Sequence, residues 1–132
     1  MTDAPATSGL IPYINVDGTA EAIAFYSRAF GATEHARNSM GDDSRILHAH
    51  VEINGGALYL SDFFPEHGFP PVARQGFNLH LQVEDAQSWF DRAVAEGCTV
   101  VMPLAKQFWG DIYGQVRDRF GVTWAIGQST QV

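Results

Sequence analysis

A chain of 132 residues with 45% hydrophobic side chains is long enough to bury one hydrophobic core, so we expect a single domain. Its 15 acidic residues outnumber its 8 Lys and Arg, which gives a formal net charge of −7. Because binding to a phosphate backbone or an anionic membrane needs clustered cations, this charge excludes sequence-independent nucleic-acid binding and argues against a membrane partner.

The features of the chain that bear on its compartment are few. Cys98 is the sole cysteine, so no disulfide can form within the chain. The N-terminal residues are small and polar without a basic leader, and no apolar run approaches the roughly 18 residues that a membrane span requires. These features predict a soluble cytoplasmic protein.

The chain repeats one plan. Residues 10–33 and 77–99 both read as strand, acidic turn, amphipathic helix and glycine, and each is followed later by a glycine turn and a short strand, at 55–60 and 121–126. The offset between matching positions stays at 66 or 67 residues. Such a repeat indicates two copies of one supersecondary unit, each too small to bury its own hydrophobic face.

We therefore predict an α+β fold of two paired βαβββ modules that form a curved mixed sheet around a cavity. Within a single domain of residues 9–129, the first module spans residues 9–62 and the second spans residues 76–129. A linker rich in proline and phenylalanine, residues 63–75, joins them. Pairing within one chain and pairing across two chains by swapping both stay open.

Both helices of the repeat carry one apolar stripe. The stripe follows the spacing i, i+3, i+4, i+7, i+8 from Ala22 to Phe30 in the first helix and from Ala86 to Val94 in the second. Short polar side chains are expected to cap the helix N-termini, and left-handed glycines are expected at the C-termini. These expected residues are Asp17 or Thr19 and Glu84 or Asp85, followed by Gly31 and Gly97.

Alternation along the strands separates an apolar face from a polar face. In residues 46–53 the odd positions, beginning with Leu47, are apolar, and three of the even positions are His48, His50 and Glu52. The apolar face is expected to pack under a helix. The same alternation assigns further residues to the polar faces, namely Tyr13, Asn15, Tyr59, Asn78, His80, Gln82 and Gln115.

Two interpretations of the polar faces stay open. The polar face of an antiparallel sheet commonly meets bulk water. Here, however, Tyr, His, Asn and Gln predominate where Lys and Glu would serve a plain solvated surface. Two such faces turned toward one another would enclose a cavity lined by aromatic rings and a few hydrogen-bonding groups, which is the interpretation we favour.

Aromatic residues also gather in two connecting segments. In the loop 108–114, Phe108 and Trp109 can cover the mouth of such a cavity, or Trp109 can fill the core. In the linker, Phe64 and Phe69 are expected to pack against the domain or a partner subunit.

Several motifs together resemble one superfamily. They are the duplicated strand-helix-strands plan, the helix ending Ala29-Phe30-Gly31, and the turn Asp118-Arg119-Phe120-Gly121 before a strand that holds Trp124. This combination resembles the vicinal oxygen chelate superfamily of glyoxalase I, extradiol dioxygenases and bleomycin-resistance proteins, and the loop 108–114 is similar to its PhnB-like branch. The resemblance covers residues 9–128 and implies a homodimer with a small-molecule ligand, without naming a reaction.

The resemblance also implies metal-ligand positions, where enzymes of the superfamily carry His, Glu or Gln. The matching residues in this chain are Ile11, Tyr59, Asn78 and Ala125. Ile and Ala have no donor atom, and neutral Tyr and Asn bind divalent transition ions poorly. We therefore expect no metal cofactor at the usual site.

A displaced metal site is the alternative. His48 and His50 on one strand, with His80 of the other module and Glu52, offer donors for Zn²⁺ or Ni²⁺. A simpler interpretation, which we favour, is that each histidine forms a hydrogen bond with a neighbouring Tyr, Asn or Gln.

The candidate catalytic residues are His48, His80 and Tyr59. An imidazole can act as a general base near neutral pH, and a phenol can polarise a carbonyl or enol oxygen. The function we predict is that of a PhnB-like protein that binds a small, planar or cationic organic molecule without the usual metal site; whether it is an enzyme stays open. The alternative is a metal-dependent lyase, isomerase or dioxygenase of the glyoxalase type. The candidate ligand-binding residues are Tyr13, Asn15, His50, Asn78, Gln82, Phe108, Trp109 and Gln115.

Overall fold

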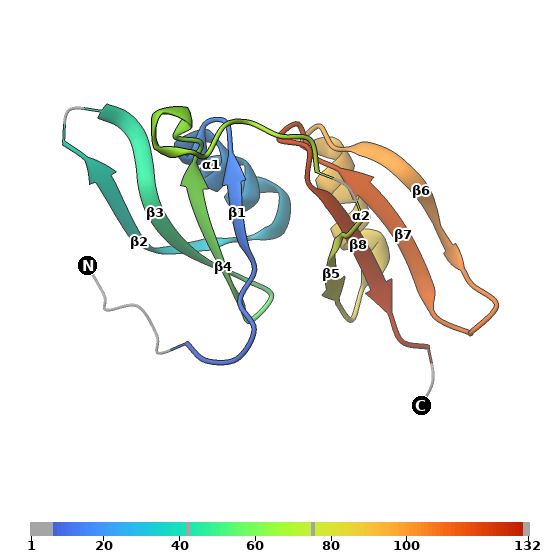
Figure 1. Ribbon diagram of the computed structural model, residues 1–132. Helices are drawn as coiled ribbons and strands as arrows, with labels where there is room; N and C mark the ends of the chain where they lie inside the picture. The colour runs from blue at the N-terminus through green and yellow to red at the C-terminus, as the bar shows by residue number, and fades with distance from the viewer. Residues whose placement is uncertain (1–6, 42, 75, 131–132) are drawn as a thin grey trace. The chain divides into compact units, whose positions relative to one another are not determined.

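The computed structural model describes residues 7–41, 43–74 and 76–130. The chain divides into two compact units, one ending at Val72 and one beginning at Ala73. Each unit is a four-stranded sheet with one helix packed on one of its faces (Figure 1). Among the described residues, no helix is long and apolar enough to span a membrane.

The first unit runs β-α-β-β-β. Its sheet has the order β1-β4-β3-β2, in which β1 runs parallel to β4 and the other neighbours are antiparallel. A short 3-10 helix follows the last strand. The elements are β1 (Tyr13–Val16), α1 (Thr19–Phe30), β2 (Thr33–Met40), β3 (Asp43–Ile53), β4 (Gly56–Asp62) and η1 (Pro65–His67).

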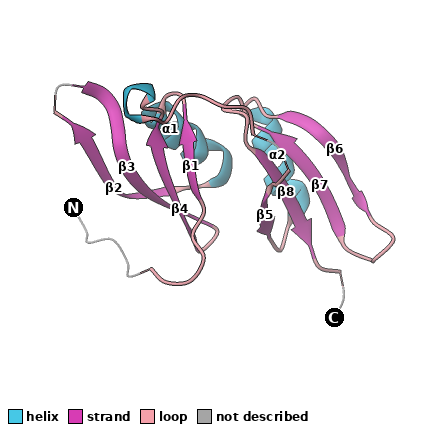
Figure 2. Cartoon of the chain, viewed as in Figure 1, coloured by secondary structure: helices cyan, strands magenta, loops and turns pink. Residues whose placement is uncertain are grey.

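The second unit repeats the same order of helix and strands (Figure 2). Its sheet has the order β5-β8-β7-β6, again with the first strand parallel to the last. The elements are β5 (Leu79–Gln82), α2 (Ala86–Ala95), β6 (Thr99–Lys106), β7 (Ile112–Arg117) and β8 (Thr123–Gln128). The predicted α+β fold of duplicated βαβββ modules, each with a mixed sheet, is thereby confirmed.

The apolar stripe of α1 forms the core of the first unit. All five predicted stripe residues between Ala22 and Phe30 are buried. The helix contacts β1, β3 and β4, whose side chains Val16, Val51 and Leu60 are fully buried. The helix covers one face of the sheet, and the opposite face is packed against no helix among the described residues of this unit.

The stripe of α2 is narrower than predicted. Ala86, Phe90 and Ala93 are buried, but Val94 is 38% exposed, so its placement in the core was wrong. At about 100° of rotation per residue, the three buried residues fall within an arc of about 60°, and Val94 lies outside that arc.

The N-termini of the two helices are held by the last strands of their own sheets. Gly18 is the N-cap of α1 and no local side chain caps it, so the predicted cap by Asp17 or Thr19 was wrong. The Asp62 carboxylate at the end of β4 instead accepts hydrogen bonds through Oδ1 from the backbone N–H of Gly18 and Thr19, at 3.0 and 3.3 Å. Its Oδ2 accepts from the backbone N–H of Ile46 at 2.7 Å.

The second unit uses a matching residue. Gln128 ends β8, 66 positions after Asp62, and its Oε1 accepts from the backbone N–H of Ala86 at 2.8 Å. Asp85 also caps α2 through a 3.2 Å bond from Ser88 N–H, which confirms one of the two predicted caps. A helix N-terminus leaves several N–H groups unpaired, so these distant acceptors fix each helix on its sheet.

A β-bulge in β3 changes the predicted faces. The pairing with β2 passes from Asn38–His48 to Ser39–Ile46, so Leu47 is an extra residue without a partner. Ile46 is therefore buried at 2% exposure while Leu47 is 50% exposed. The prediction that Leu47 packs under the helix was wrong because strict alternation ignores the inserted residue.

We expect Asp62→Ala to lower the free energy of unfolding by about 2–4 kcal/mol, because three buried or part-buried N–H groups lose their acceptor. Gln128→Ala, the matched change in the second unit, removes one such bond and should cost about 1 kcal/mol. Urea denaturation followed by circular dichroism measures both. Equal losses in the two variants would contradict the assignment of Asp62 as a three-way acceptor.

Candidate functional site

Tyrosine and histidine rings gather on the polar face of the first sheet. Tyr13 on β1 pairs with Tyr59 on β4, and Tyr59 pairs with His50 on β3. His48 lies beside this row, with its ring centroid 4.9 Å from that of Tyr59 and 5.5 Å from that of Tyr13. We call Tyr13, His48, His50 and Tyr59 the Tyr–His cluster.

A hydrogen bond of 2.9 Å joins the Tyr13 hydroxyl to Nδ1 of His48. Burial raises the pKa of Tyr13, so its phenol keeps its proton, and the tautomer of His48 decides whether the phenol donates to Nδ1 or accepts from Nδ1–H. The bond engages Nδ1, and Nε2 is then the ring nitrogen of His48 that can meet a ligand.

A second bulge brings His35 to this cluster. The register of β2 on β3 passes from Glu34–Val51 to Ala36–His50, which leaves His35 as the inserted residue. Its ring centroid lies 5.2 Å from that of His50, and its Nε2 lies 3.0 Å from Oε1 of Glu52. Sequence alternation could not find His35, because a bulge redirects its side chain.

His50 is the buried member of the cluster, at 5% exposure. Its pKa is lowered first by burial and then by repulsion from His35 and His48, while Glu52 acts in the opposite direction. The folded protein therefore favours the neutral form of His50.

Stability should fall as the pH drops below about 6.5, because the unfolded chain protonates His50 at its ordinary pKa of 6.5 and the folded chain does not. The contribution has a maximum slope of about 1.4 kcal/mol per pH unit. His50→Gln should flatten the slope of unfolding free energy between pH 7 and 5. An NMR titration of the His50 ring that gave a pKa at or above 6.5 would contradict this cause.

A cavity of about 490 Å³ lies on the polar face of the first sheet. The sheet supplies its floor, and the segment that follows β4 supplies an aromatic wall. Tyr13 and Asn15, two candidate ligand-binding residues, line it together with the bulged Leu47. The remaining lining residues are Ser61, Asp62, Phe64, His67 and Phe69.

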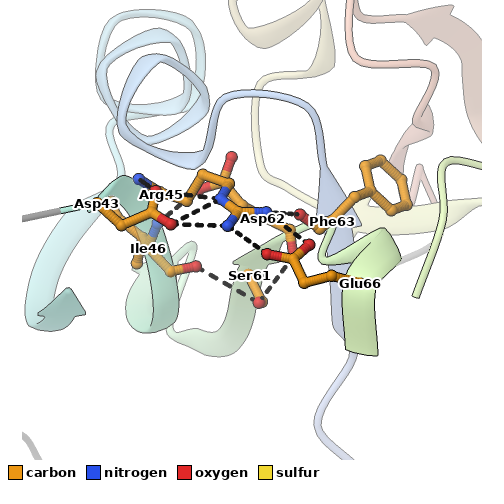
Figure 3. A network of polar contacts seen from close by, with 7 residues as sticks. All are labelled: Asp43, Arg45, Ile46, Ser61, Asp62, Phe63 and Glu66. Carbon is orange, nitrogen blue, oxygen red and sulfur yellow. Dashed lines mark hydrogen bonds and ion pairs between the residues drawn. The ribbon is translucent and has the colours of Figure 1, made fainter. Parts of the chain in front are cut away.

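Arg45 anchors the aromatic wall of this cavity to β3 (Figure 3). Its guanidinium makes two hydrogen bonds of 2.6 and 3.0 Å to the Glu66 carboxylate and lies 2.7 Å from Oδ2 of Asp43. Arg45 also lies 4.4 Å above the ring of Phe64 and donates to the backbone oxygen of Phe63. The wall is thus positioned by a charged side chain on the neighbouring strand.

The wall is closed by its own backbone as well. Phe64 and Phe69 exchange two backbone hydrogen bonds, of 2.9 and 3.0 Å. Phe64 is buried, as expected of the linker aromatics, whereas Phe69 is exposed. Both line the cavity, which sequence analysis did not predict.

Arg45→Gln should loosen this wall, because it removes the charge-assisted hydrogen bonds to Asp43 and Glu66, which also lower the pKa of both carboxylates to about 2. We expect faster amide hydrogen exchange at Phe64 and Phe69, measured by NMR. Arg37→Gln is the matched control, since Arg37 pairs with Glu34 on β2 and should leave that exchange unchanged. Unchanged exchange in Arg45→Gln would show that the backbone bonds alone hold the wall.

The polar face of the second sheet carries a different group. His80 lies 2.8 Å from Oε1 of Gln82 through its Nε2 and stacks on Tyr113, with ring centroids 5.9 Å apart. Gln115 donates from Nε2 to the Tyr113 hydroxyl at 2.9 Å. Trp109 meets the edge of Tyr113 at 5.8 Å. Tyr113 therefore contacts three of the polar-face side chains. It lies in the aromatic loop 108–114 but was not one of the candidate site residues predicted from the sequence.

A glycine makes room for His80. A Cβ on Gly127 would lie 2.8 Å from Cε1 of His80 and 3.1 Å from Oε1 of Gln82. The side chains of β5 therefore lie across β8, and no larger residue fits there without moving them. Beside Gly127, Ala125 pairs with His80 and adds a second small residue to the same strand.

A cavity of about 330 Å³ lies on the polar side of the second sheet. Two candidate ligand-binding residues, Asn78 and Gln115, line it. The other lining residues are Arg74, Gly76, Phe77, Val101, Arg117, Gly121 and Thr123. Arg117 lies two residues after Gln115 on β7, so alternation places both side chains on the same face. A charged residue at a strand end would ordinarily be assigned to solvent, which is why the sequence did not mark Arg117 as a candidate.

The eleven candidate residues divide between the units. Tyr13, Asn15, His48, His50 and Tyr59 belong to the first, where contacts link four of them into the Tyr–His cluster. Six candidates belong to the second unit, namely Asn78, His80, Gln82, Phe108, Trp109 and Gln115. Phe108 is 97% exposed and touches Trp109, and neither lines either cavity.

The residues at the positions that the superfamily uses for metal ligands do not fit a divalent metal. Ala125 is buried in the second sheet and Ile11 precedes β1, and neither side chain has a donor atom. The Tyr59 hydroxyl lies 2.9 Å from Oγ1 of Thr7, and Asn78 lines the second cavity.

The family model described as the glyoxalase/bleomycin resistance protein/dioxygenase superfamily matches residues 9–126. The chain belongs to this superfamily. Protein Mb0911c of Mycobacterium bovis is 41% identical over 125 residues, which are 90% of this chain and 82% of that protein. This glyoxalase-superfamily fold also matches the structure of protein PA1353 from Pseudomonas aeruginosa, with a TM-score of 0.78, 31% identity and coverage of 93% and 98% of the two chains. A PhnB protein from Bacillus cereus matches with a TM-score of 0.72 and 19% identity over 92% of this chain and 100% of that one.

Proposed function

We propose that this glyoxalase-superfamily protein binds a small organic molecule on the polar faces of its sheets, without the metal ligands usual in the superfamily. The observation that carries the proposal is the first cavity, in which the sheet floor and the anchored aromatic wall enclose about 490 Å³. This volume lies within the roughly 300–1,000 Å³ typical of small-molecule sites. The proposal includes the cytoplasmic location expected from the sequence and the homodimer that the resemblance implies.

The packing of the rings on the polar face argues against a plain solvated sheet, even though Tyr13 is 51% exposed. Side chains that merely meet water extend into it, but here His50 is 5% exposed and three rings of the cluster contact Tyr59. Buried polar rings cost free energy unless their contacts compensate for lost water. A packed and pre-positioned ring cluster suits a binding site, since little side-chain entropy is then lost on binding.

The lining predicts the chemistry of the ligand. Tyr13, Leu47 and Phe69 offer apolar and aromatic surface, while the Asn15 amide can donate and accept hydrogen bonds. The Asp62 carboxylate already accepts three backbone N–H groups and is 6% exposed, so little of it can meet a ligand. These features favour a planar aromatic body over a purely cationic one.

Proton transfer is the second candidate activity, favoured by the Tyr13–His48 bond. His48 can act as a general base through Nε2 in the tautomer whose Nδ1–H donates to the Tyr13 hydroxyl oxygen, and Tyr59 lies against the ring to meet a carbonyl or enol oxygen. His80, stacked on Tyr113, is the candidate base of the second unit through Nδ1, because its Nε2–H donates to Oε1 of Gln82. In the metal-dependent alternative, His48 and His50 would bind Zn²⁺ or Ni²⁺ in a displaced site.

An NMR titration with quinoline and N-methylquinolinium tests the binding proposal. We expect quinoline to shift the amide resonances of Asn15, Leu47 and Phe69. Phe69→Ala should raise the Kd for quinoline about fivefold, because the stacking contact is lost. Leu10→Ala is the control, because Leu10 is 98% exposed and lies outside the cavity lining. The cationic analogue should bind no more tightly than quinoline.

The result that would overturn the proposal is equal weakening in Leu10→Ala and Phe69→Ala, or shifts confined to residues outside the first cavity. If the protein converts a bound ligand to a product and His48→Ala does not, the result would favour the proton-transfer candidate. Zn²⁺ uptake at a stoichiometric ratio, lost in the same variant, would favour the displaced metal site.

A further inference from the structure

Two arginines line the second cavity of a chain that is otherwise acidic. The whole protein has 8 Lys and Arg against 15 Asp and Glu, yet Arg74 and Arg117 both lie at this one cavity of about 330 Å³. Among the described residues that line it there is no Asp or Glu. The cavity therefore concentrates positive charge.

The contacts of these arginines leave most of their donors for a ligand. Arg74 donates from Nη1 to the backbone oxygen of Phe120 at 2.7 Å, and Arg117 donates from Nε to Oγ1 of Thr123 at 3.3 Å. Each guanidinium has five N–H donors, so these bonds to neutral oxygens use a small share of them. Within residues 7–41, 43–74 and 76–130, neither arginine is paired with a carboxylate.

Other arginines of the chain show the contrast. Arg37 is paired with Glu34, and Arg45 is paired with both Asp43 and Glu66. Two guanidinium groups in one cavity repel each other, and an oxyanion between them would offset that repulsion and accept several charge-assisted hydrogen bonds.

The rest of the lining completes a site for an organic anion. The Asn78 and Gln115 amides and the Thr123 hydroxyl can bind the remaining oxygens. Phe77 and Val101 are exposed apolar side chains that line the same cavity, and they suit the carbon body of a ligand. Phe77 precedes β5 and lies outside the core, in contrast with the buried Leu81 and Val83.

We propose that Arg74 and Arg117 form an oxyanion subsite for a small organic acid, with a carboxylate or a phosphoryl group between the guanidiniums and an apolar or aromatic body against Phe77. The subsite rests on the proposed function, since it names the class of molecule that the protein binds. At this cavity the proposal favours an anion over the cationic ligand considered from the sequence, because two arginines would repel a cation.

The test is an NMR titration of the full chain with benzoate, phenyl phosphate and benzamide. Benzamide is the neutral match for benzoate, and the two anions distinguish a carboxylate from a phosphoryl group. We expect one of the anions to bind at least tenfold more tightly than benzamide, with shifts at the amides of Asn78, Gln115 and Thr123. Raising the salt concentration should weaken the binding of that anion but not that of benzamide.

Arg117→Gln should weaken binding of the preferred anion about tenfold or more, and Arg117→Lys should weaken it less because the charge stays while the fork is lost. Arg92→Gln on α2 is the matched control, since it removes the same charge outside the cavity lining. Arg74→Gln should act like Arg117→Gln, and the spectrum of the free protein reports whether the turn at Phe120 keeps its fold.

Two results would overturn the subsite: benzamide binding as tightly as both anions, or Arg92→Gln weakening anion binding as much as Arg117→Gln does. If quinoline binds the first cavity while neither anion shifts the second, the subsite fails and the proposed function stands. If neither quinoline nor the anions bind, both fail together.

Discussion

The carboxylate of Asp62 is the constraint on which the first unit depends. It accepts hydrogen bonds from the N-terminus of α1 and from β3, and thus joins three elements at the point where β4 ends. Because the helix is fixed on one face, the other face is left to polar and aromatic side chains. The same residue begins the segment that becomes the aromatic wall, and it lines the cavity beneath that wall. The side chain that holds the helix therefore also forms part of the cavity lining.

In the second unit, a neutral amide at the matching position holds the helix, and the buried carboxylate lies instead in the turn between β7 and β8. Gln128 gives α2 one neutral hydrogen bond. Asp118 accepts from the backbone N–H groups of Phe120 and Val122 and from the indole Nε1 of Trp124, at 2.9 to 3.0 Å. This buried carboxylate closes the turn between β7 and β8 and fixes the indole in the core. Arg74 donates a hydrogen bond to the Phe120 backbone oxygen in this same turn, so the turn contacts both the core and the second cavity.

The sequence predicts the duplicated fold well because a repeat and its periodicities are local properties of the chain. It also predicts that residues such as His48 and Tyr59 share a face, since strand alternation has a fixed period. It misses the positions of Leu47 and His35, because an inserted residue in β3 or β2 reverses the alternation and nothing in the composition marks it. The aromatic wall is missed for another reason: its place depends on Arg45, whose partners on the wall lie about twenty residues away along the chain.

The contrast between the two polar faces follows from the strand that lies in the same place in each unit. β4 carries Tyr59 and Ser61 where β8 carries Ala125 and Gly127, as the pairing with the first strand of each unit establishes. The Tyr59 ring on β4 projects from the sheet and packs against the rings of His48 and His50. Small residues on β8 instead let His80 lie across the strand. Tyr59 and Ala125 are also two of the positions where the resemblance places the metal ligands of the superfamily, so the same two residues offer a poor ligand and none, and give the two floors different shapes. Under the proposed function, the first face offers its ligand a ring cluster, whereas the second offers a pair of guanidinium groups.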